Sequence, residues 1–351
     1  MKAVGYYQSL PIDHPDALLD LELPEPTPGP RDLLVEVRAI SVNPVDTKVR
    51  QRAQPEAGQA KVLGWDAAGV VRAVGSEVSL FRPGDRVWYA GDITRPGSNS
   101  ELHRVDERIV GHLPKSLDFA QAAALPLTTI TAWELLFERL QIAEGKADQG
   151  QSLLVVGAAG GVGSILVQLA RQLTGLNVIG TASRAETQAW VRDLGAHHVI
   201  DHGKPLAEEL KRIGIAEVSH VASLTHTDQH LEQIVAALRP QGRLALIDDP
   251  ASLDIGKLKQ KSLSLHWEFM YTRSMFQTDD MIEQHRLLER VAGLIDEGVL
   301  KTTVGEHFGR IDAANLRRAH ALLESGRVRE SEINQKGKAR KLWDIEEGKG
   351  I

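Results

Sequence analysis

The stretch that most constrains the fold of this chain runs from Leu153 to Leu173 and reads LLVVGAAGGVGSILVQLARQL. It opens with four apolar residues, two of them β-branched, which is typical of a buried parallel strand. A glycine-rich turn follows, and apolar residues then recur at helical spacing. A strand, a glycine turn and a helix in this order let backbone N–H groups approach a pyrophosphate at the helix N-terminus. The stretch therefore predicts a dinucleotide-binding fold.

The glycine pattern is imperfect, because Ala158 stands where the first glycine of G-x-G-x-x-G would be. The alternative is an ordinary tight turn, but the surrounding strand and helix are the context that supports the dinucleotide motif. The residues expected to bind the cofactor in this turn are Gly157, Ala159, Gly160, Gly161 and Val162.

The next predicted strand, 177–182, indicates which dinucleotide binds. It ends in Ser183-Arg184, with no Asp or Glu at its tip to accept a hydrogen bond from a ribose 2′-hydroxyl. A hydroxyl and a guanidinium suit a 2′-phosphate, so the sequence favours NADPH over NADH. Ser183 with Glu186 could also form a capping box for the following helix, and both roles can coexist.

Length and composition bound the class of protein. A chain of 351 residues suggests two domains, and 42% apolar with 25% charged residues is typical of a soluble globular protein. The net charge of −6 argues against nucleic acid as a partner, and no apolar run is long enough for a membrane span. The N-terminus reads as a strand, so we expect a cytoplasmic protein. With no cysteine, disulfides and cysteine-based metal sites are excluded.

The chain changes character along its length. Residues 1–125 contain many short predicted strands separated by turns, which suggests a barrel-like domain. Strands then alternate with helices, and this pattern predicts a parallel sheet. We expect an α/β protein in which residues 126–271 form a doubly wound sheet that binds NADPH. Residues 1–125, completed by about 272–351, would form the other domain, with long helices over 279–296 and 312–325.

Several segments together resemble the medium-chain dehydrogenase/reductase superfamily, in its zinc-free quinone oxidoreductase branch. They are ISVNPVD, GWDAAGVVRAVG, FRPGDRVW, AAALPLTTITAW, VVGAAGGVG and LGAHHVID. The resemblance implies a GroES-like β-barrel catalytic domain, a Rossmann domain and a cleft between them. It also implies a homodimer, formed by edge pairing of the last Rossmann strand near 263–269.

The chain departs from the zinc-dependent members of that superfamily. Those relatives hold the metal with a Cys near 41–46, a His in the segment GHE, and a later Cys or Asp. Here that segment reads Gly64-Trp65-Asp66, and the four-cysteine lobe is absent after Val87. We therefore predict no metal site, and a name of the zinc type would be inherited from the superfamily.

One cluster has metal-like spacing, namely His226, Asp228 and His230. Alternate residues of an extended segment share a face. The alternative, a polar loop that leads into a helix, is favoured because no third His or carboxylate partner is evident.

The resemblance also assigns site residues. It implies that Asn43 lies beside the nicotinamide ribose, that Asp46 follows one turn later, and that Thr131 approaches the carboxamide. Tyr89 is the best-placed proton donor among four tyrosines, and Trp65 would fill the place of the zinc-binding His. Further cofactor contacts are expected at the ends of the later strands, at Ser223, Leu224, Thr225, Ile247 and Phe269.

Some of these residues have simpler explanations. Asn43 could be a turn residue before Pro44, and Asp46 could be a helix N-cap. Trp65 is better explained by packing than by chemistry. The C-terminal tail after Gly326 is charged and lacks the apolar strand with which relatives end, so it is atypical.

The chemistry follows from the missing metal. Without a Lewis acid, alcohol oxidation is disfavoured, and hydride transfer to a quinone or an α,β-unsaturated carbonyl is easier. We therefore expect an NADPH-dependent oxidoreductase of such acceptors. The alternatives are a lyase, a label that some relatives carry, and a non-catalytic nucleotide-binding protein.

Overall fold

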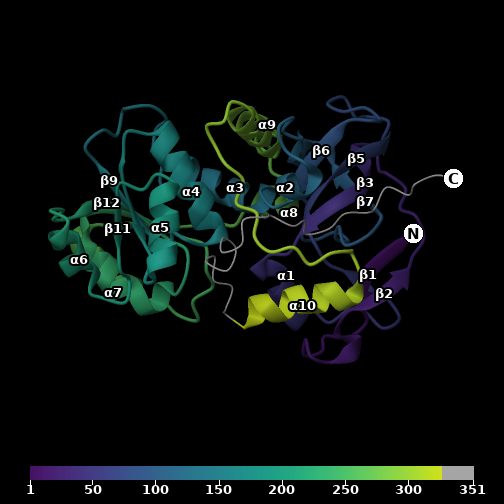
Figure 1. The fold of residues 1–351 in the computed structure, drawn as a ribbon, viewed down its shortest axis with the longest axis horizontal. Helices are drawn as coiled ribbons and strands as arrows, with labels where there is room; N and C mark the ends of the chain where they lie inside the picture. Colours follow the sequence, from purple (N-terminus) through teal and green to yellow (C-terminus); the bar gives the residue numbers. More distant parts are fainter. Residues whose placement is uncertain (326–351) are drawn as a thin grey trace. The chain divides into compact units, whose positions relative to one another are not determined.

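The computed structural model describes residues 1–325, and the chain divides into two compact units. Unit 1 comprises Met1–Leu127 together with the segment that starts at Tyr271, and unit 2 comprises Thr128–Met270. The atypical tail noted in the sequence lies outside the described residues. Figure 1 labels the helices and strands of both units.

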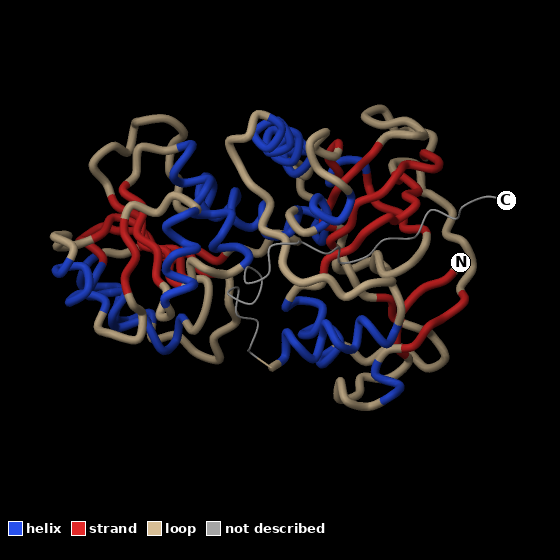
Figure 2. Tube along the Cα trace, in the orientation of Figure 1, coloured by secondary structure: helices blue, strands red, loops and turns tan. Residues whose placement is uncertain are grey.

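Unit 1 is built on two antiparallel sheets, drawn in red in Figure 2. The larger sheet has the strand order β7-β3-β5-β6-β8, and the smaller has the order β2-β1-β4. The strands are β1 (Lys2–Tyr6), β2 (Leu19–Glu22), β3 (Asp32–Ser41), β4 (Lys61–Val62), β5 (Asp66–Val74), β6 (Arg86–Ala90), β7 (Leu102–Asp106) and β8 (Val110–His112). The predicted strand at 33–40 is the central strand β3, which explains why most of its residues are buried.

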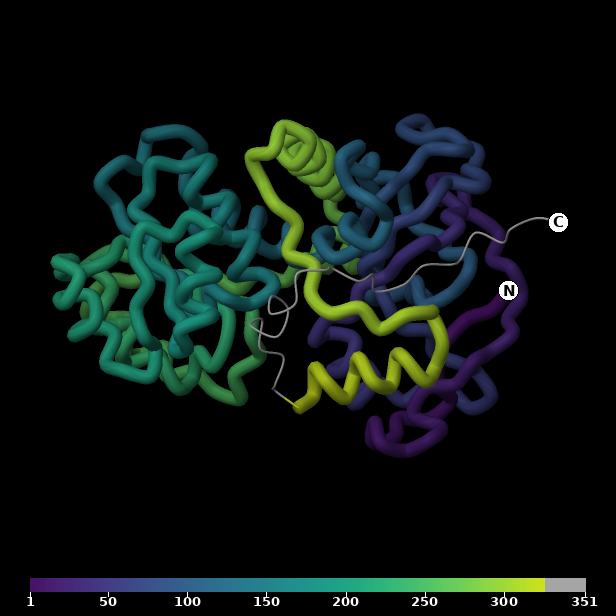
Figure 3. The backbone as a smooth tube through the Cα atoms, in the orientation of Figure 1, coloured from purple at the N-terminus to yellow at the C-terminus, as the bar shows by residue number. Residues whose placement is uncertain are grey.

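The helices of unit 1 come from both ends of the chain. They are α1 (Pro44–Arg52), α2 (Phe119–Ala123), α8 (Thr272–Phe276), α9 (Ile282–Asp296) and α10 (Ala313–Glu324), with the short 3₁₀ helices η1 (Pro15–Ala17) and η2 (Glu107–Ile109). Helix α10 lies beside α1 and the N-terminal segment (Figure 3). The buried guanidinium of Arg50 in α1 bonds the Leu10 carbonyl and the Glu324 carboxylate, so it ties these segments together.

Unit 2 contains a six-stranded parallel sheet with the order β11-β10-β9-β12-β13-β14. Its strands are β9 (Ser152–Val156), β10 (Asn177–Thr181), β11 (His198–Ile200), β12 (Val218–Ser223), β13 (Leu238–Leu246) and β14 (Ser264–Trp267). Its helices are α4 (Gly161–Leu173), α5 (Ala185–Asp193), α6 (Leu206–Arg212) and α7 (Thr227–Ala237), with the π-helix η3 (Glu134–Arg139) and the 3₁₀ helix η4 (Ile255–Lys261). Helix α3 (Pro126–Trp133) starts in unit 1 and ends in unit 2.

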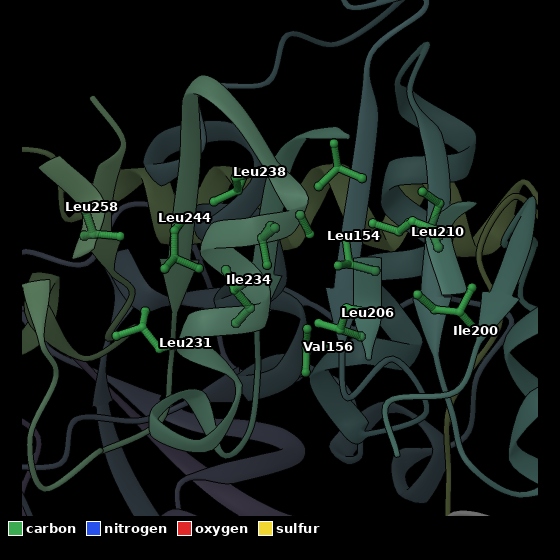
Figure 4. Close-up of a cluster of buried hydrophobic side chains, with 14 residues drawn as sticks. Leu154, Val156, Ile200, Leu206, Leu210, Leu231, Ile234, Leu238, Leu244 and Leu258 are labelled. Atoms are coloured by element: carbon green, nitrogen blue, oxygen red, sulfur yellow. The ribbon is translucent and has the colours of Figure 1, made fainter. Parts of the chain in front are cut away.

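Apolar side chains fill one face of this sheet, as Figure 4 shows. Leu154 and Val156 of β9 pack there with Ile234 of α7 and Leu210 of α6. Alternate residues of a strand point to opposite faces, so β9 also supplies Leu153 and Val155 to the other, fully buried face. A strand buried on both faces reads as a continuous apolar run, which is the pattern that the sequence shows.

Candidate functional site

The parallel sheet of unit 2 has a topological switch point. Chain connections run from β9 outward through β10 to β11, and then return to β12 on the other side of β9. In open α/β sheets ligands bind at such a point, outside the carboxyl ends of the strands. The glycine turn follows β9 directly, and residues 224–226 follow β12. The predicted cofactor residues therefore come from the edge where this fold binds ligands.

The glycine turn is closely packed at that edge. Gly157 adopts φ +82°, a left-handed conformation that favours glycine, and its N–H donates to Thr181 Oγ1 over 3.1 Å. A Cβ atom at Gly157 would lie 3.0 Å from Cγ2 of Thr225. A Cβ atom at Gly163 would lie only 2.5 Å from the Gly157 carbonyl oxygen. Helix α4 can begin this close to the turn only because these positions lack side chains.

The N-terminus of α4 fits a pyrophosphate. Gly160 is its N-cap, and the N–H groups of the first helical turn have no carbonyl one turn earlier to bond. They carry the positive end of the helix dipole. A Cβ atom at Gly161 would lie 3.2 Å from Cγ2 of Thr128, so α3 lies close to the turn. Thr131 lies one turn further along α3 and is buried.

The tip of β10 differs in one respect from the sequence prediction. The N-cap of α5 is Arg184, and no side chain caps this helix. The capping box of Ser183 with Glu186 is therefore not formed. Ser183 is exposed and Arg184 is half-buried at the tip, with no acidic residue between Thr181 and Arg184.

Buried hydrogen bonds hold the ends of the later strands in place. The Ser223 and Thr227 hydroxyls lie 2.7 Å apart, and the N–H and hydroxyl of Thr227 both donate to Asp248. The Trp267 indole donates to the Asp248 carbonyl over 3.2 Å. The sequence analysis did not single out Thr181 or Thr227 as members of this edge, although each ends a strand or starts a helix there.

Other predicted residues lie at the same edge. Leu224 and Thr225 lie close to Gly157. The Ile247 N–H donates to the Ser223 carbonyl over 3.4 Å. Phe269 is 46% exposed just beyond β14.

The histidines near this edge do not form a metal centre. His226 bonds Thr225 Oγ1 through Nδ1 at 2.6 Å, and the His230 ring packs against that of His202 with centroids 6.1 Å apart. Within residues 1–325, no group of three or more His, Cys, Asp or Glu side chains is arranged to hold a metal ion. The alternative explanation of a polar segment at the start of a helix describes His226 well, because it is the N-cap of α7.

Unit 1 contains a second candidate site, centred on Asn43. Asn43 is the N-cap of α1, and its N–H donates to Asp46 Oδ2 over 2.7 Å. Its side-chain Nδ2 donates to Asp66 Oδ2 over 2.8 Å, and the Leu127 N–H donates to Asp66 Oδ1 over 2.8 Å. Asp46 is therefore not the N-cap but a first-turn residue that bonds it. The sequence analysis missed Asp66, because a strand residue 23 positions away gives no local signal.

Both carboxyl groups titrate abnormally. Burial raises the pKa of Asp46 to about 7, while the nearby amides of Asn43 and Gly64 act in the opposite direction. Burial also raises the pKa of Asp66 well above its ordinary value, and the Asp46 charge adds to that rise. Groups with strongly shifted pKa values cluster at functional sites, so these two carboxyls are candidates for chemistry.

The predicted proton donor Tyr89 lies in the larger sheet of unit 1 and bonds a histidine. Its side chain is fully buried, and its hydroxyl lies 3.0 Å from His103 Nδ1. Burial raises the pKa of Tyr89 and lowers that of His103 to about 4, so the pair is neutral at physiological pH. Tyr89 is therefore a core residue of the larger sheet. Tyr271 lies nearer the acids, since Asp46 and Asp66 both raise its pKa after burial.

The side chains at this site do not fit zinc. Trp65, which stands in place of the zinc-binding His, is 1% exposed and donates through Nε1 to the Asp92 carbonyl. Its ring meets that of Tyr271 edge to face, with centroids 6.1 Å apart. Protein zinc sites use three or four thiolate, imidazole or carboxylate ligands, whereas this site offers two carboxyls with an indole and an amide. Within residues 1–325 no third such ligand joins them. Packing accounts for Trp65.

Comparison with known proteins identifies the class. Residues 29–115 match the family described as Alcohol dehydrogenase GroES-like domain, and residues 194–329 match the family described as Zinc-binding dehydrogenase. A zinc-type alcohol dehydrogenase-like protein of Staphylococcus epidermidis is 38% identical over 93% of this chain and 96% of its own length. The fold and the matches define a nicotinamide-dependent oxidoreductase with a GroES-like domain and a Rossmann-like sheet.

Solved structures agree with this class. A protein from Rhizobium etli, named for a zinc-dependent alcohol dehydrogenase, is 57% identical and superposes with a TM-score of 0.90, covering 94% of this chain and 96% of that one. Quinone oxidoreductase of Escherichia coli, solved with NADPH, is 28% identical with a TM-score of 0.79, covering 94% and 98%. The chain belongs to the medium-chain dehydrogenase/reductase superfamily, in its quinone oxidoreductase-like branch. Among residues 1–325, no helix is both long and apolar enough to cross a membrane.

Proposed function

We propose that this chain is a zinc-independent reductase that uses NADPH to reduce quinones or α,β-unsaturated carbonyl compounds. The observation that carries the cofactor choice is the tip of β10, where Ser183 and Arg184 stand and no acidic residue is present. An acid there would repel a 2′-phosphate, whereas a guanidinium can bind it through two hydrogen bonds. The NADPH in the Escherichia coli relative supports the same choice.

In this proposal unit 2 holds the cofactor. The turn Gly157–Gly161 and the first amides of α4 would bind the pyrophosphate, and the ends of β12, β13 and β14 would line the rest of the site. When bound, the nicotinamide supplies the hydride. Thr131, Asn43 and Asp46 would serve the reacting end, as the resemblance implies.

We infer zinc independence from the side chains that are available to bind a metal. The sequence has no cysteine, and Trp65 replaces the imidazole that zinc-dependent relatives use. Reduction of an activated acceptor then needs only hydrogen-bond donors to stabilise the oxygen that gains charge. We also propose a homodimer, because β14 is an edge strand and carries the exposed Trp267.

Titration with NADPH and NADH tests the cofactor assignment. We expect NADPH to bind more tightly than NADH. The substitution Arg184→Ala should lower the affinity for NADPH by about tenfold and change the affinity for NADH by less than about twofold. Arg192→Ala, which removes the same charge from the other end of α5, is the matched control and is expected to leave both affinities unchanged. If Arg184→Ala lowered the affinities for NADPH and NADH equally, Arg184 would not contact the 2′-phosphate.

Turnover tests the reaction. Chelator-treated protein should oxidise NADPH with a small panel of quinones and enones at an unchanged rate. Nucleotide binding without turnover would favour a non-catalytic role, and product release from uronate polymers without NADPH would favour a lyase.

A further inference from the structure

Asp46 and Asp66 are two buried carboxyl groups joined by one residue. Asp46 lies in the first turn of α1 and is 1% exposed, while Asp66 opens β5 and is fully buried. Asn43 bonds Asp46 through its backbone N–H and Asp66 through its side-chain Nδ2. Any change in the charge of one carboxyl is therefore felt by the other at short range.

The four carboxyl oxygens are not equivalent. Asp66 Oδ1 accepts the Leu127 N–H, Asp66 Oδ2 accepts Asn43 Nδ2, and Asp46 Oδ2 accepts the Asn43 N–H. The fourth oxygen, Asp46 Oδ1, is buried and has no hydrogen-bond partner within the described residues, although the nearby Gly64 amide favours the charged form of this carboxyl. An oxygen that accepts an N–H is better suited to carry negative charge, so Asp46 Oδ1 is the atom best suited to carry a proton.

No cation is among the groups that shift the pKa of either carboxyl. Arg50 lies one turn beyond Asp46 on α1, but its guanidinium bonds the Leu10 carbonyl and Glu324. Both acids raise the pKa of Tyr271, which supplies no positive charge. Two buried carboxylates without a counter-ion cannot both ionise cheaply, and burial raises the pKa of both. One proton shared by the pair is the arrangement expected near neutral pH.

We propose that Asp46 and Asp66 form an acid pair whose single proton resides on Asp46 Oδ1 and is delivered to the substrate after hydride addition. This inference rests on the proposed function. Hydride addition to the β-carbon of an enone leaves a negative charge shared between the α-carbon and the carbonyl oxygen. The Asp46 O–H bond breaks, a new bond to hydrogen forms at the α-carbon, and the saturated ketone results. Asp46 is left as a carboxylate and regains its proton from water.

Asp66 acts through Asp46 and is a positioning residue. Two carboxylates at this range oppose each other, so the charge of either acid favours the protonated form of the other. Both Asp66 oxygens accept N–H groups, from Asn43 and Leu127, so we place the charge on Asp66 and the proton on Asp46. If the two acids served only to cap α1, replacing either by an amide would change stability but would leave the pH dependence of turnover in place. The proposal therefore predicts effects on pH profiles that capping does not.

Asp46→Asn is the direct test, because the amide keeps a hydrogen-bond acceptor for the Asn43 N–H but has no acidic proton. We expect enone turnover to fall by about 100-fold, with NADPH affinity unchanged within about twofold. Quinone turnover should fall less, because oxygen anions take protons from water readily. Asp66→Asn should move the alkaline limb of the pH profile, which we expect near pH 7 in the parent, to lower pH. Asp118→Asn, the same change at the exposed N-cap of α2, is the matched control.

A second measurement tests the pair without turnover. At pH 7 the infrared difference spectrum, parent minus Asp46→Asn, should contain a protonated-carboxyl band, because the band of Glu268 is common to both proteins and cancels. If the parent binds nucleotide but reduces no acceptor, the proposed function fails. The infrared band then still shows whether the acid pair holds a proton at pH 7. A difference spectrum without that band, or a variant with full enone turnover, would overturn the acid pair.

Discussion

Gly163→Ala is expected to destabilise the protein by about 2–3 kcal/mol and to weaken NADPH binding strongly. The new Cβ atom would lie 2.5 Å from the Gly157 carbonyl oxygen and 2.6 Å from that of Ala158. Both are backbone atoms of the glycine turn, so they can move only if the turn moves away from α4. Urea unfolding and NADPH titration measure the two effects.

Gly293→Ala is the matched control for this substitution. Gly293 also lies inside a helix, α9, but nothing lies within 4 Å of its added Cβ atom. Alanine has the higher helix propensity, so this variant should gain up to about 1 kcal/mol and bind NADPH as the parent does. If Gly163→Ala is as stable as Gly293→Ala, the close approach of helix and turn is not required.

The glycine turn shows what the sequence can predict. Strand, turn and helix are neighbours in the chain, and their apolar spacing and glycine content are local properties. The predicted strands at 153–156, 177–182 and 198–200 therefore agree with β9, β10 and β11 within a residue or two. The resemblance across the whole chain supplied the order of the two domain types, which the family matches confirm.

The acid site shows what local patterns cannot predict. Asp66 meets Asn43 only because β5 begins beside the start of α1, and that pairing depends on the sheet. Tyr89 was selected for its chemistry, but alternation along β6 turns its hydroxyl toward His103 in the core. Side-chain direction and distant partners set the pKa values, so they required the structure.

A second buried acid pair, in unit 2, contacts the guanidinium of Arg139. Glu134 and Glu268 have side chains that are 1% and 0% exposed, and Arg139 lies between them. Its Nε is 2.8 Å from Glu268 Oε2 and its Nη2 is 3.8 Å from Glu134 Oε2. Burial and the Glu134 charge raise the pKa of Glu268 to about 10, while Arg139 opposes this rise and the more distant Glu138 adds to it. Glu268 therefore holds its proton at pH 7.

Arg139→Met is expected to lower the free energy of unfolding by about 3 kcal/mol at pH 7. Without the guanidinium the second carboxyl must also be protonated in the folded state. An ordinary Glu has a pKa of 4.5, and each pH unit above that costs about 1.4 kcal/mol. Because the folded variant would keep this carboxyl protonated over the whole range, the loss is small at pH 5 and grows as the pH rises. Urea unfolding between pH 5 and pH 8 measures this slope.

Two further variants separate charge from packing. Glu268→Gln removes the group that holds the proton, so it should stabilise the protein at pH 7, by up to about 3 kcal/mol if the amide packs as the acid does. Arg243→Met removes a cation that bonds only the neutral Leu140 carbonyl and Gln141, near the end of the same π-helix. This variant should lower the free energy of unfolding by about 1 kcal/mol, and the loss should be the same at pH 7 and pH 8. If Arg139→Met lost no more unfolding free energy than Arg243→Met, or if its loss did not vary with pH, Arg139 would not stabilise the charge of the two acids.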